Sequence, residues 1–376
     1  MSDRAGLYLS DRQRLHWLRL IRTPNVGPAS FRDLVNRFGS AEAAIEMLPE
    51  LMISGGAKRP ARIPSQAEAE AEFEAARKAG ARFVAMGEPD YPPVMRSMPH
   101  PPPLLAVRGK GAVFRQPAVA IVGARNASLS GTKMARSLAT ALGAAGYSVV
   151  SGLARGIDTA AHRGGLATGT IAAMAGGLDQ PYPPENAALC DEIVDHGGAL
   201  ISEMPFGWQP RAQDFPRRNR LVAGMTLGLV VVEAAKRSGS LISARLAGEM
   251  GRLVFAVPGS PLDPRAAGAN GLLKEGAILV TEPADILSAL APLVGPQAPP
   301  ALSLEEPPDF SATPPPDADD RARVVEALGP APIPIDEIIR HTGLEAAQVF
   351  MVLLELDLAG RLERHAGGQV SLLFPD

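Results

Sequence analysis

The fold of this chain is decided by the stretch Val119-Ala120-Ile121-Val122-Gly123-Ala124-Arg125. Apolar residues follow one another here without alternation, which predicts a strand that is buried on both faces of a sheet. Similar apolar runs recur, and segments with helical periodicity lie between most of them. The predicted strands are residues 118–123, 147–151, 170–174, 199–202, 227–232, 253–257 and 277–280. This order predicts an α/β fold with a doubly wound, mostly parallel sheet, whose ligand site lies beyond the carboxyl ends of the strands.

The composition allows a large core and leaves the charge unevenly spread. Of the 376 residues, 46% are hydrophobic and 20% are charged, which excludes a chain that is disordered throughout. The net charge is -3, yet residues 119–252 contain 13 Lys or Arg against 10 Asp or Glu. The net value therefore averages a mildly basic body with acidic appendages. A nucleic acid would have to be held by a few focused phosphate contacts and by stacking, because a broad positive field is absent.

The cysteine count and the N-terminal residues bear on the compartment. Cys190 is the single cysteine, which excludes an intramolecular disulfide and a four-cysteine metal site. Residues 1–14 carry charges where a signal peptide would need an apolar stretch, and no apolar run approaches the roughly 18 residues of a spanning helix. We expect a cytoplasmic protein that uses no metal and no cofactor.

Proline-rich segments divide the chain into domains. Residues 291–320 contain nine prolines and six acidic residues without Lys or Arg, which predicts an extended linker. A second proline-rich segment spans residues 89–103. The predicted organisation is a helical domain at 1–80, an α/β domain at 81–290, the linker, and a tail domain at 321–376.

The N-terminal domain has the pattern of a helical hairpin. Helical periodicity on both sides of Asn25-Val26-Gly27-Pro28 predicts two helices joined by a tight turn, as in a SAM or helix-hairpin-helix unit. Such a turn can donate backbone N–H groups to a DNA phosphate. A plain helical bundle explains the same pattern, and the sequence leaves both interpretations open.

The tail has the pattern of a winged helix. Helical segments at 336–341 and 345–358 flank a turn, and a hairpin turn at Gly367-Gly368 suggests a wing. The second helix would be the recognition helix, but it carries Glu345, Glu355 and Asp357 and neither Lys nor Arg. Carboxylates in a DNA groove meet phosphate repulsion. We therefore predict that this helix does not read DNA and that the module has a protein-contact or regulatory role.

The first strand of the body ends in a glycine and an arginine. Gly123 allows a phosphate to approach the backbone, and the following helix N-terminus favours an anion. Arg125 stands where the dinucleotide fingerprint has its second glycine, so NAD and FAD binding are disfavoured. Arg125 could contact a phosphate directly or form a surface ion pair.

The second strand ends in a tight glycine loop, Ser151-Gly152-Leu153-Ala154-Arg155-Gly156. Asp158 and His162 follow at a spacing of four residues and share one helix face. This pair suggests acid–base chemistry, or a capping carboxylate beside a hydrogen-bonded histidine. No nucleophile motif such as Gly-x-Ser-x-Gly accompanies it.

Arginines alternate with aromatic residues in residues 204–220, which contain four arginines and three aromatic side chains. Single-strand binders combine basic groups with stacking rings in this way. Alternatively, Phe206 and Phe215 are core wedges, and the arginines pair with Glu203 and Asp214. The sequence supports the two interpretations equally.

The strongest phosphate-binding pattern follows the strand predicted at 227–232. Lys236 and Arg237 bring charge, Gly239 permits close approach, and Ser240 is a natural helix cap. The order lacks the Gly-Lys-Ser/Thr of a Walker motif, so ATP hydrolysis is not implied. Residues 257–260 and 268–271 add predicted turns at the same rim.

Taken in order, these motifs closely resemble the bacterial DNA-processing protein A (DprA/Smf) family from about residue 85 to residue 280. The resemblance rests on residues 91–93, 119–125, 151–158, 177–179, 182–183, 186, 201–203, 215–220, 238–240 and 258–259. Ala124 and Ser243 depart from the usual Ser and Thr of the family. The resemblance implies an extended Rossmann-like domain that binds single-stranded DNA, engages and loads the RecA recombinase in natural transformation, and forms a homodimer. It places the basic pocket near Arg125 and Lys236, and it implies a helical N-terminal part and a winged-helix tail.

The candidate site therefore joins the strand-end glycines and serines with the nearby basic side chains. Its members are Gly123, Arg125, Ser151, Gly152, Arg155, Arg217, Arg218, Asn219, Arg220, Lys236, Ser238, Gly239 and Ser240. We expect a binding protein without enzymatic activity. The alternative is a Rossmann-like nucleotide phosphoribohydrolase, of which Gly176-Gly177-Leu178-Asp179 and Glu233 offer only fragments. A sequence-specific regulator acting through the tail is disfavoured by its acidic helix.

Overall fold

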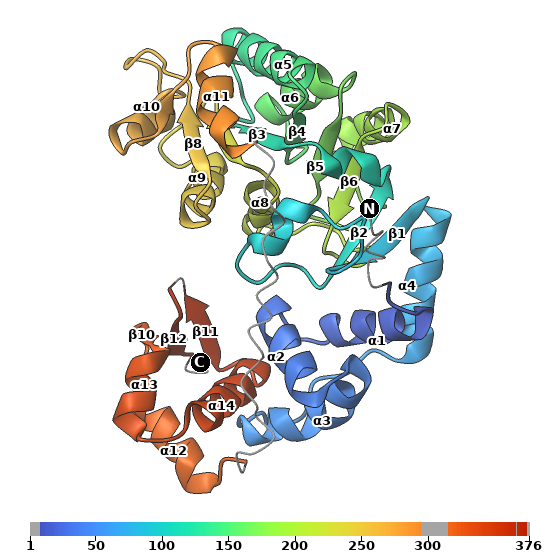
Figure 1. Cartoon of the computed structure of the whole chain (residues 1–376), viewed down its shortest axis with the longest axis vertical. Helices are drawn as coiled ribbons and strands as arrows, with labels where there is room; N and C mark the ends of the chain where they lie inside the picture. Colours follow the sequence, from blue (N-terminus) through green and yellow to red (C-terminus); the bar gives the residue numbers. More distant parts are fainter. Residues whose placement is uncertain (1–7, 295–314, 366, 374–376) are drawn as a thin grey trace. The chain divides into compact units, whose positions relative to one another are not determined.

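The computed structural model describes residues 8–294, 315–365 and 367–373, which separate into two compact units (Figure 1). The α/β unit contains Tyr8 and the described residues from Ala71 to residue 294. The terminal unit combines residues 9–70 with the described residues from 315 onward, so that it joins the two ends of the chain.

A nine-stranded sheet forms the centre of the α/β unit, in the order β1-β2-β6-β5-β4-β3-β7-β8-β9. The strands are β1 Ala81–Ala85, β2 Leu104–Gly109, β3 Ala118–Val122, β4 Ser148–Ser151, β5 Thr170–Ala173, β6 Ala199–Ser202, β7 Gly228–Val231, β8 Leu253–Ala256 and β9 Ile278–Leu279. The β1–β2 and β2–β6 pairs are antiparallel and the other pairs are parallel. The predicted α/β fold is confirmed, and each predicted strand is present. The sequence interpretation did not include β1 and β2, because the proline-rich segment between them interrupts the alternation of strand and helix.

Helices cover both faces of this sheet. Val119 and Ile121 of β3 belong to one core, whereas Ala120 and Val122 belong to the other, as the alternation of a strand requires. The first core includes side chains of α5 (Leu129–Ala144), α6 (Ile157–Gly165) and α11 (Pro283–Leu290). The second includes side chains of α8 (Asp214–Gly224), α9 (Gly239–Glu249) and α10 (Ala267–Lys274). A further helix, α7 (Ala187–Asp195), precedes β6.

Two segments differ from the sequence interpretation. Residues 268–271 were predicted as a turn and lie instead within α10, so that prediction is wrong. A Cβ at Gly268 would lie 2.8 Å from the carbonyl oxygen of Ala234, so this glycine permits close packing of α10 and does not form a turn. The arginine-rich segment that begins at Asp214 forms α8, a helix that the sequence interpretation did not assign.

The order of the strands locates the ligand site. β3 pairs with β4 on one side and with β7 on the other, both in parallel. The chain therefore changes direction across the sheet at β3, and a crevice opens there at the carboxyl ends of the strands.

The terminal unit contains two small helical modules. The N-terminal module has α1 (Asp11–Ile21), α2 (Pro28–Phe38) and α3 (Ala41–Ser54), and α4 (Gln66–Lys78) follows it in the chain. The C-terminal module has α12 (Ala318–Ala327), α13 (Ile335–Thr342) and α14 (Ala346–Leu358), with a sheet ordered β10-β12-β11. Its strands are β10 Ile333–Pro334, β11 Leu362–His365 and β12 Gln369–Leu372. The predicted helical hairpin and winged helix are both confirmed.

Most of the predicted linker, residues 295–314, lies outside the described residues. At its described end, α12 begins at Ala318, before the predicted boundary at residue 320. The Asp317 carboxylate accepts the Asp320 N–H at 2.8 Å, and the Asp320 carboxylate accepts the Asp317 N–H at 3.2 Å. These acidic residues therefore cap a helix N-terminus, where negative charge is favourable.

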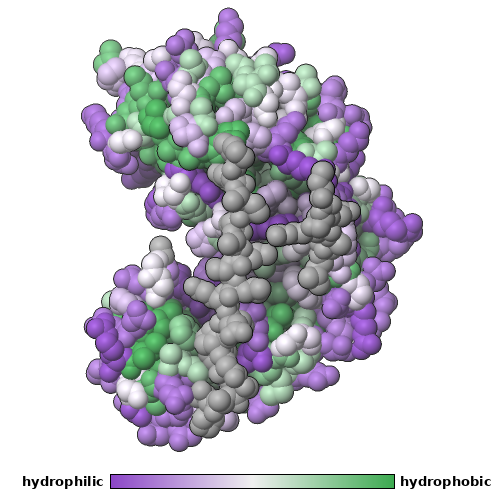
Figure 2. Space-filling view, in the orientation of Figure 1, coloured by the Kyte–Doolittle hydropathy of each residue, from purple (hydrophilic) through white to green (hydrophobic). Residues whose placement is uncertain are grey.

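The surface of each unit is mixed in character. In Figure 2, hydrophilic side chains are interspersed among hydrophobic ones over the visible face of each unit. No helix in the described parts of the chain is long and apolar enough to cross a membrane.

Candidate nucleic-acid interface

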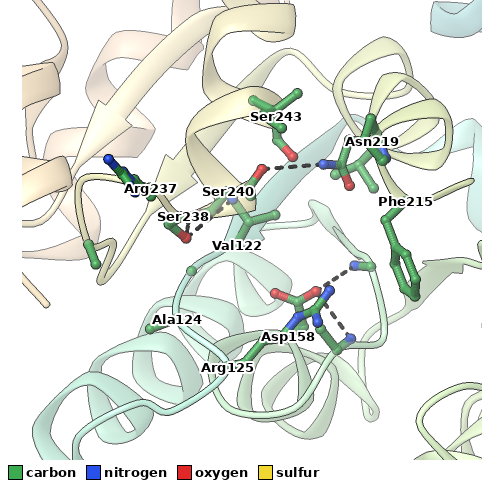
Figure 3. Close-up of a pocket in the computed structure, with 18 of the residues that line it drawn as sticks. Val122, Ala124, Arg125, Asp158, Phe215, Asn219, Arg237, Ser238, Ser240 and Ser243 are labelled. Atoms are coloured by element: carbon green, nitrogen blue, oxygen red, sulfur yellow. Dashed lines mark hydrogen bonds between the residues drawn. The ribbon is translucent and has the colours of Figure 1, made fainter. Parts of the chain in front are cut away.

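A cavity of about 580 Å³ opens at the carboxyl ends of β3, β4 and β7 (Figure 3). The loops after these strands line it together with one face of α8 and the start of α9. Its charged lining side chains are one carboxylate, Asp158, and the arginines Arg125, Arg218, Arg237 and Arg265. This excess of positive charge at a topological switch point suits an anionic ligand.

The helical periodicity of α8 determines which residues of the arginine-rich segment line the cavity. Phe215, Arg218, Asn219 and Val222 of α8 line the cavity at the i, i+3, i+4 and i+7 spacing of one helix face. Arg217 is exposed elsewhere on the helix. Arg220 pairs with the Glu203 carboxylate and donates to the His100 carbonyl oxygen at 3.0 Å.

The residues of this segment therefore divide between packing contacts and the lining of the cavity. Phe206 makes an edge-to-face contact with Phe83 at 6.0 Å between ring centroids, and Arg220 is paired with a carboxylate as the alternative proposed. The Asp214 carboxylate accepts bonds from Trp208 Nε1 and the Arg211 N–H. Phe215, by contrast, is half-buried and lines the cavity.

The start of α9 forms a phosphate-sized cradle. Ser238 caps the helix, and its hydroxyl lies 2.6 Å from the Ser240 hydroxyl. A Cβ added at Gly239 would meet no atom of the described residues within 4 Å, so none of these residues covers the backbone there. Asn219 Nδ2 donates to the Gly239 carbonyl oxygen at 3.3 Å and ties α8 to this cradle (Figure 3). The positive end of the helix dipole favours an anion here.

Arg125 and two aromatic rings form the other wall. The Arg125 guanidinium carbon lies 5.2 Å from the centre of the Phe215 ring. Tyr182 meets the same ring edge to face at 5.5 Å between centroids, and its side chain is 47% exposed. These three residues and Arg155 line a second cavity of about 340 Å³ that shares Gly152 and Arg218 with the first. Rings beside guanidinium groups provide a surface on which a base can stack.

The loop after β4 is held from beneath by two buried side chains of opposite charge, Asp158 and Arg218. The Asp158 carboxylate accepts the N–H groups of Gly152 and Ala154, each at 3.2 Å. Arg218 Nη1 donates to the Gly152 carbonyl oxygen and, at 3.1 Å, to that of Ala173. Burial raises the pKa of Asp158, and the nearby Arg218 charge opposes this shift. Arg218 is 6% exposed, so it shapes the floor of the cavity more than it meets solvent.

The anion seat at the start of α5 is already occupied by a side chain of this protein. The Glu233 carboxylate accepts the Ser128 hydroxyl at 2.5 Å and the Ser128 N–H at 2.9 Å. A Cβ at Gly131 would lie 2.5 Å from the Glu233 carboxyl carbon, so the carboxylate packs tightly on the first turn. Dinucleotide-binding proteins place the pyrophosphate at this helix N-terminus. The closed seat therefore argues against NAD and FAD, in agreement with the missing fingerprint.

Three of the predicted site residues, Ser151, Gly123 and Arg155, make contacts with other residues of the protein. Ser151 is fully buried, and its hydroxyl donates to the Ile121 carbonyl oxygen at 2.7 Å. Gly123 lines the cavity, but a Cβ there would lie 2.7 Å from Ile157 Cγ1, so the glycine also lets β3 meet α6 closely. Arg155 pairs with Glu185 at 2.5 Å while both side chains remain more than half exposed.

Lys236, which the resemblance places at the basic pocket, lines a neighbouring groove of about 1100 Å³ between α9 and α10. Arg237 lines both this groove and the cavity. The sequence interpretation also left Asn126, Tyr182 and Arg265 out of the site. Tyr182 carried a usable signal, because it stands in one of the resembling blocks, whereas Arg265 reaches the cavity only through the fold.

Asp158 and His162 have the arrangement of the second alternative, a capping carboxylate beside a hydrogen-bonded histidine. His162 is fully buried, and its Nδ1 lies 2.8 Å from Thr170 Oγ1, which itself donates to the Val149 carbonyl oxygen. Nδ1 therefore carries the proton, and the buried Nε2 has no hydrogen-bond partner among the described residues. Burial lowers the pKa of His162 to about 3. A neutral, enclosed imidazole cannot exchange protons with a ligand at neutral pH.

His162 should make the protein sensitive to acid. Its pKa is about 3 when folded against 6.5 for a free histidine, so between these values the unfolded chain binds more protons. Stability should fall by up to about 1.4 kcal/mol per pH unit below 6.5 from this residue alone. The His162→Asn variant keeps an N–H donor for Thr170 and should lose this component. Urea unfolding of both proteins at pH 7 and pH 5 measures it, and an equal loss of stability in both would contradict the assignment.

The fold and the cavity together define a class of protein. It is a Rossmann-like α/β protein whose dinucleotide seat is closed and whose switch point holds an arginine-lined cavity, with helix-hairpin-helix and winged-helix modules attached. The chain belongs to the DNA processing protein A (DprA/Smf) family. The model of DNA recombination-mediator protein A matches residues 82–291, that of the DprA-like N-terminal HHH domain matches residues 11–75, and that of the DprA winged helix domain matches residues 306–368.

Relatives support this assignment across most of the chain. Protein Smf of Escherichia coli is 38% identical over 286 residues, which are 75% of each chain. The X-ray structure of DNA processing protein A from Streptococcus pneumoniae superposes with a TM-score of 0.59 at 31% identity, over 75% of this chain and 98% of that one. The structure of DNA processing protein A from Helicobacter pylori superposes with a TM-score of 0.52 at 28% identity, over 57% of this chain and 98% of that one.

Proposed function

We propose that this chain binds single-stranded DNA at the arginine-lined cavity. The observation that carries the proposal is the grouping of the exposed Tyr182 ring and the half-buried Phe215 ring with Arg125, beside the start of α9. Phosphates would lie against the arginines and the α9 N-terminus, and a base would stack on the rings. The related protein from Helicobacter pylori has a single-stranded DNA binding mode, which supports this assignment.

The proposal extends to the role in the cell. A mediator that loads RecA on incoming strands during natural transformation, in the cytoplasm, agrees with the recombination-mediator family to which the chain belongs. We propose that the protein acts as a homodimer. The support for this is the resemblance to the DprA/Smf family, which implies a homodimer.

Titration with labelled oligonucleotides tests the central proposal. A single strand should bind at least about tenfold more tightly than a duplex of the same sequence, because stacking on Tyr182 and Phe215 requires unpaired bases. The logarithm of the affinity should fall linearly with the logarithm of salt concentration, by about 0.7 per phosphate contact. Preference for the duplex, or no binding at low salt, would refute it.

A nucleotide phosphoribohydrolase remains the competing function, and we propose that the protein has no enzymatic activity. The glutamate that such an enzyme would need, Glu233, is engaged by the N–H and hydroxyl groups of Ser128 at the start of α5. Asp158 lines the cavity but is held by two backbone N–H groups. Incubation with AMP or CMP separates the two functions, since release of the base would establish the enzyme.

A further inference from the structure

The helix-hairpin-helix turn and the recognition helix of the winged-helix module are the two elements with which such modules ordinarily bind DNA. In the terminal unit these two elements contact each other. The Asn25 side-chain amide, in the turn between α1 and α2, donates to the Leu358 carbonyl oxygen at the end of α14 at 3.1 Å. This bond satisfies one of the carbonyl groups that a helix C-terminus leaves without a partner.

Helix α14 is buried on two sides. Val349, Val352 and Leu356 face the core of the winged-helix module, as the recognition helix of such a module does. Met351, Leu354 and Leu358 instead join the core of the N-terminal module, together with side chains of α1, α2 and α3. Two faces of α14 are therefore buried against protein. A helix that enters a DNA groove instead keeps one face exposed and polar.

The contact between α3 and α14 is a close backbone approach. A Cβ at Gly55, at the end of α3, would lie 1.9 Å from the Glu355 carbonyl oxygen and 3.0 Å from the Ala359 Cβ. Arg361 Nη1 donates to the Gly55 carbonyl oxygen at 3.2 Å. Packing at this distance requires a glycine and excludes any third molecule from between the helices.

The charges of α14 are neutralised inside the terminal unit. Glu355 is 2% exposed and receives two bonds of 2.7 Å from the Arg321 guanidinium. Arg364, on the wing strand β11, donates to Asp357 at 2.9 Å and reaches Asp33 of α2 at 3.4 Å. The acidic recognition helix thus has cationic partners within the unit, one of which connects the two modules.

The turn itself has few N–H groups left for a phosphate. The Thr23 N–H donates to the Leu20 carbonyl oxygen at 3.1 Å, and the Val26 N–H donates to the Thr23 carbonyl oxygen at 3.1 Å. The Gly27 N–H donates to Ser30 Oγ at 3.0 Å. Pro24 and Pro28 have no N–H group. The alternative of phosphate binding by this turn is therefore disfavoured by its own hydrogen bonds.

We propose that the winged-helix module is a docking module for the N-terminal helical module of the same chain, and that each covers the DNA-binding element of the other. DNA is then bound by the α/β unit, while the terminal unit acts as one folded body. The inference is independent of the cavity, because it would hold even if the α/β unit bound a different anion.

Hydrogen exchange on the full-length chain tests the contact. Gly55→Ala should make the backbone of both α3 and α14 exchange about ten- to a hundredfold faster, because the added methyl group separates the helices. Gly329→Ala is the matched control in the same unit, since a Cβ there meets nothing within 4 Å. Unchanged exchange in α14 of the Gly55 variant would overturn the proposal.

A milder variant covers the case in which Gly55→Ala does not fold. Asn25 has a positive φ of 64°, which glycine adopts freely, so Asn25→Gly removes only the side-chain bond to Leu358. Exchange should rise at the C-terminal end of α14 and in the turn, and not in α12. Unchanged exchange at both of those places would count against the proposal.

Hydrogen exchange of the unmodified chain, measured in the presence of an oligo-dT probe and separately of a duplex, tests whether DNA avoids the two covered elements. Protection should appear in the loops after β3, β4 and β7 and stay absent from residues 22–28 and 346–358. Protection of either of the last two segments by either probe would overturn the proposal. If neither probe protected any segment, including the loops of the α/β unit, the proposed DNA-binding function would be refuted. The contact between the modules would then be judged by the two variants alone.

Discussion

Replacing Arg125 with alanine should weaken single-strand binding by about 1.5–3 kcal/mol, which is roughly a 10- to 150-fold loss of affinity. Arg125 lines both adjoining cavities and lies over the Phe215 ring, so its loss removes a charged contact and one side of the stacking surface. The slope of log affinity against log salt should flatten by about 0.7 if one phosphate contact is lost. Fluorescence anisotropy at several salt concentrations measures both quantities.

The matched control removes an arginine from the opposite end of the same strand. Arg115 is exposed and precedes β3, whereas Arg125 follows it. Arg115→Ala changes the net charge equally and should leave affinity and salt slope nearly unchanged. Equal losses in both variants would mean that binding depends on overall charge and that the cavity is wrongly assigned.

Lys236 and Arg237 permit a finer comparison. The resemblance to the family points to Lys236, but the structure places Lys236 in the groove between α9 and α10 and Arg237 at the border of that groove and the cavity. A strand confined to the cavity should depend more on Arg237, and a strand that continues along the groove should depend on both. The two alanine variants therefore trace the path of the strand.

The sequence predicted the fold because its signals are local and redundant. Seven uninterrupted apolar runs separated by helices leave few alternatives to a parallel sheet, and the glycine at the end of β3 marks its turn. The antiparallel β1–β2 pair escaped prediction because pairing across a proline-rich loop leaves no comparable local pattern.

The site was predicted in composition but not in arrangement. Arg217, Arg218 and Arg220 are equivalent in a list of basic residues, and only the helical phase of α8 separates them. The role of Glu233 was equally ambiguous, since it depends on hydrogen bonds from Ser128, the capping residue of α5, which is distant in sequence. The acidity of α14, by contrast, is readable without the fold. The hypothesis drawn from it, that this helix does not read DNA, stays a prediction.

Replacing Arg218 with alanine should have the largest effect on stability, a loss of about 3–5 kcal/mol, because it leaves the buried Asp158 carboxylate without its counter-charge. The Gly152 and Ala173 carbonyl oxygens lose their donor at the same time. Burial already raises the pKa of Asp158, and removal of Arg218 raises it further. Protonation of the stranded carboxyl then relieves the penalty, so the deficit relative to wild type should shrink as the pH falls. Urea unfolding at pH 7 and pH 5 measures both effects.

The neighbouring arginine provides the control for this result. Arg217→Ala lies one residue away on the exposed side of α8 and should change stability by no more than about 0.5 kcal/mol. Asp158→Asn combined with Arg218→Ala removes both charges and should recover part of the loss, because an uncompensated carboxylate costs more than an absent ion pair. If the double variant were as unstable as Arg218→Ala at every pH, the loss would come from the two carbonyl bonds. Arg218 would then support the Gly152 loop through hydrogen bonds alone, and its charge would be free to serve the bound strand.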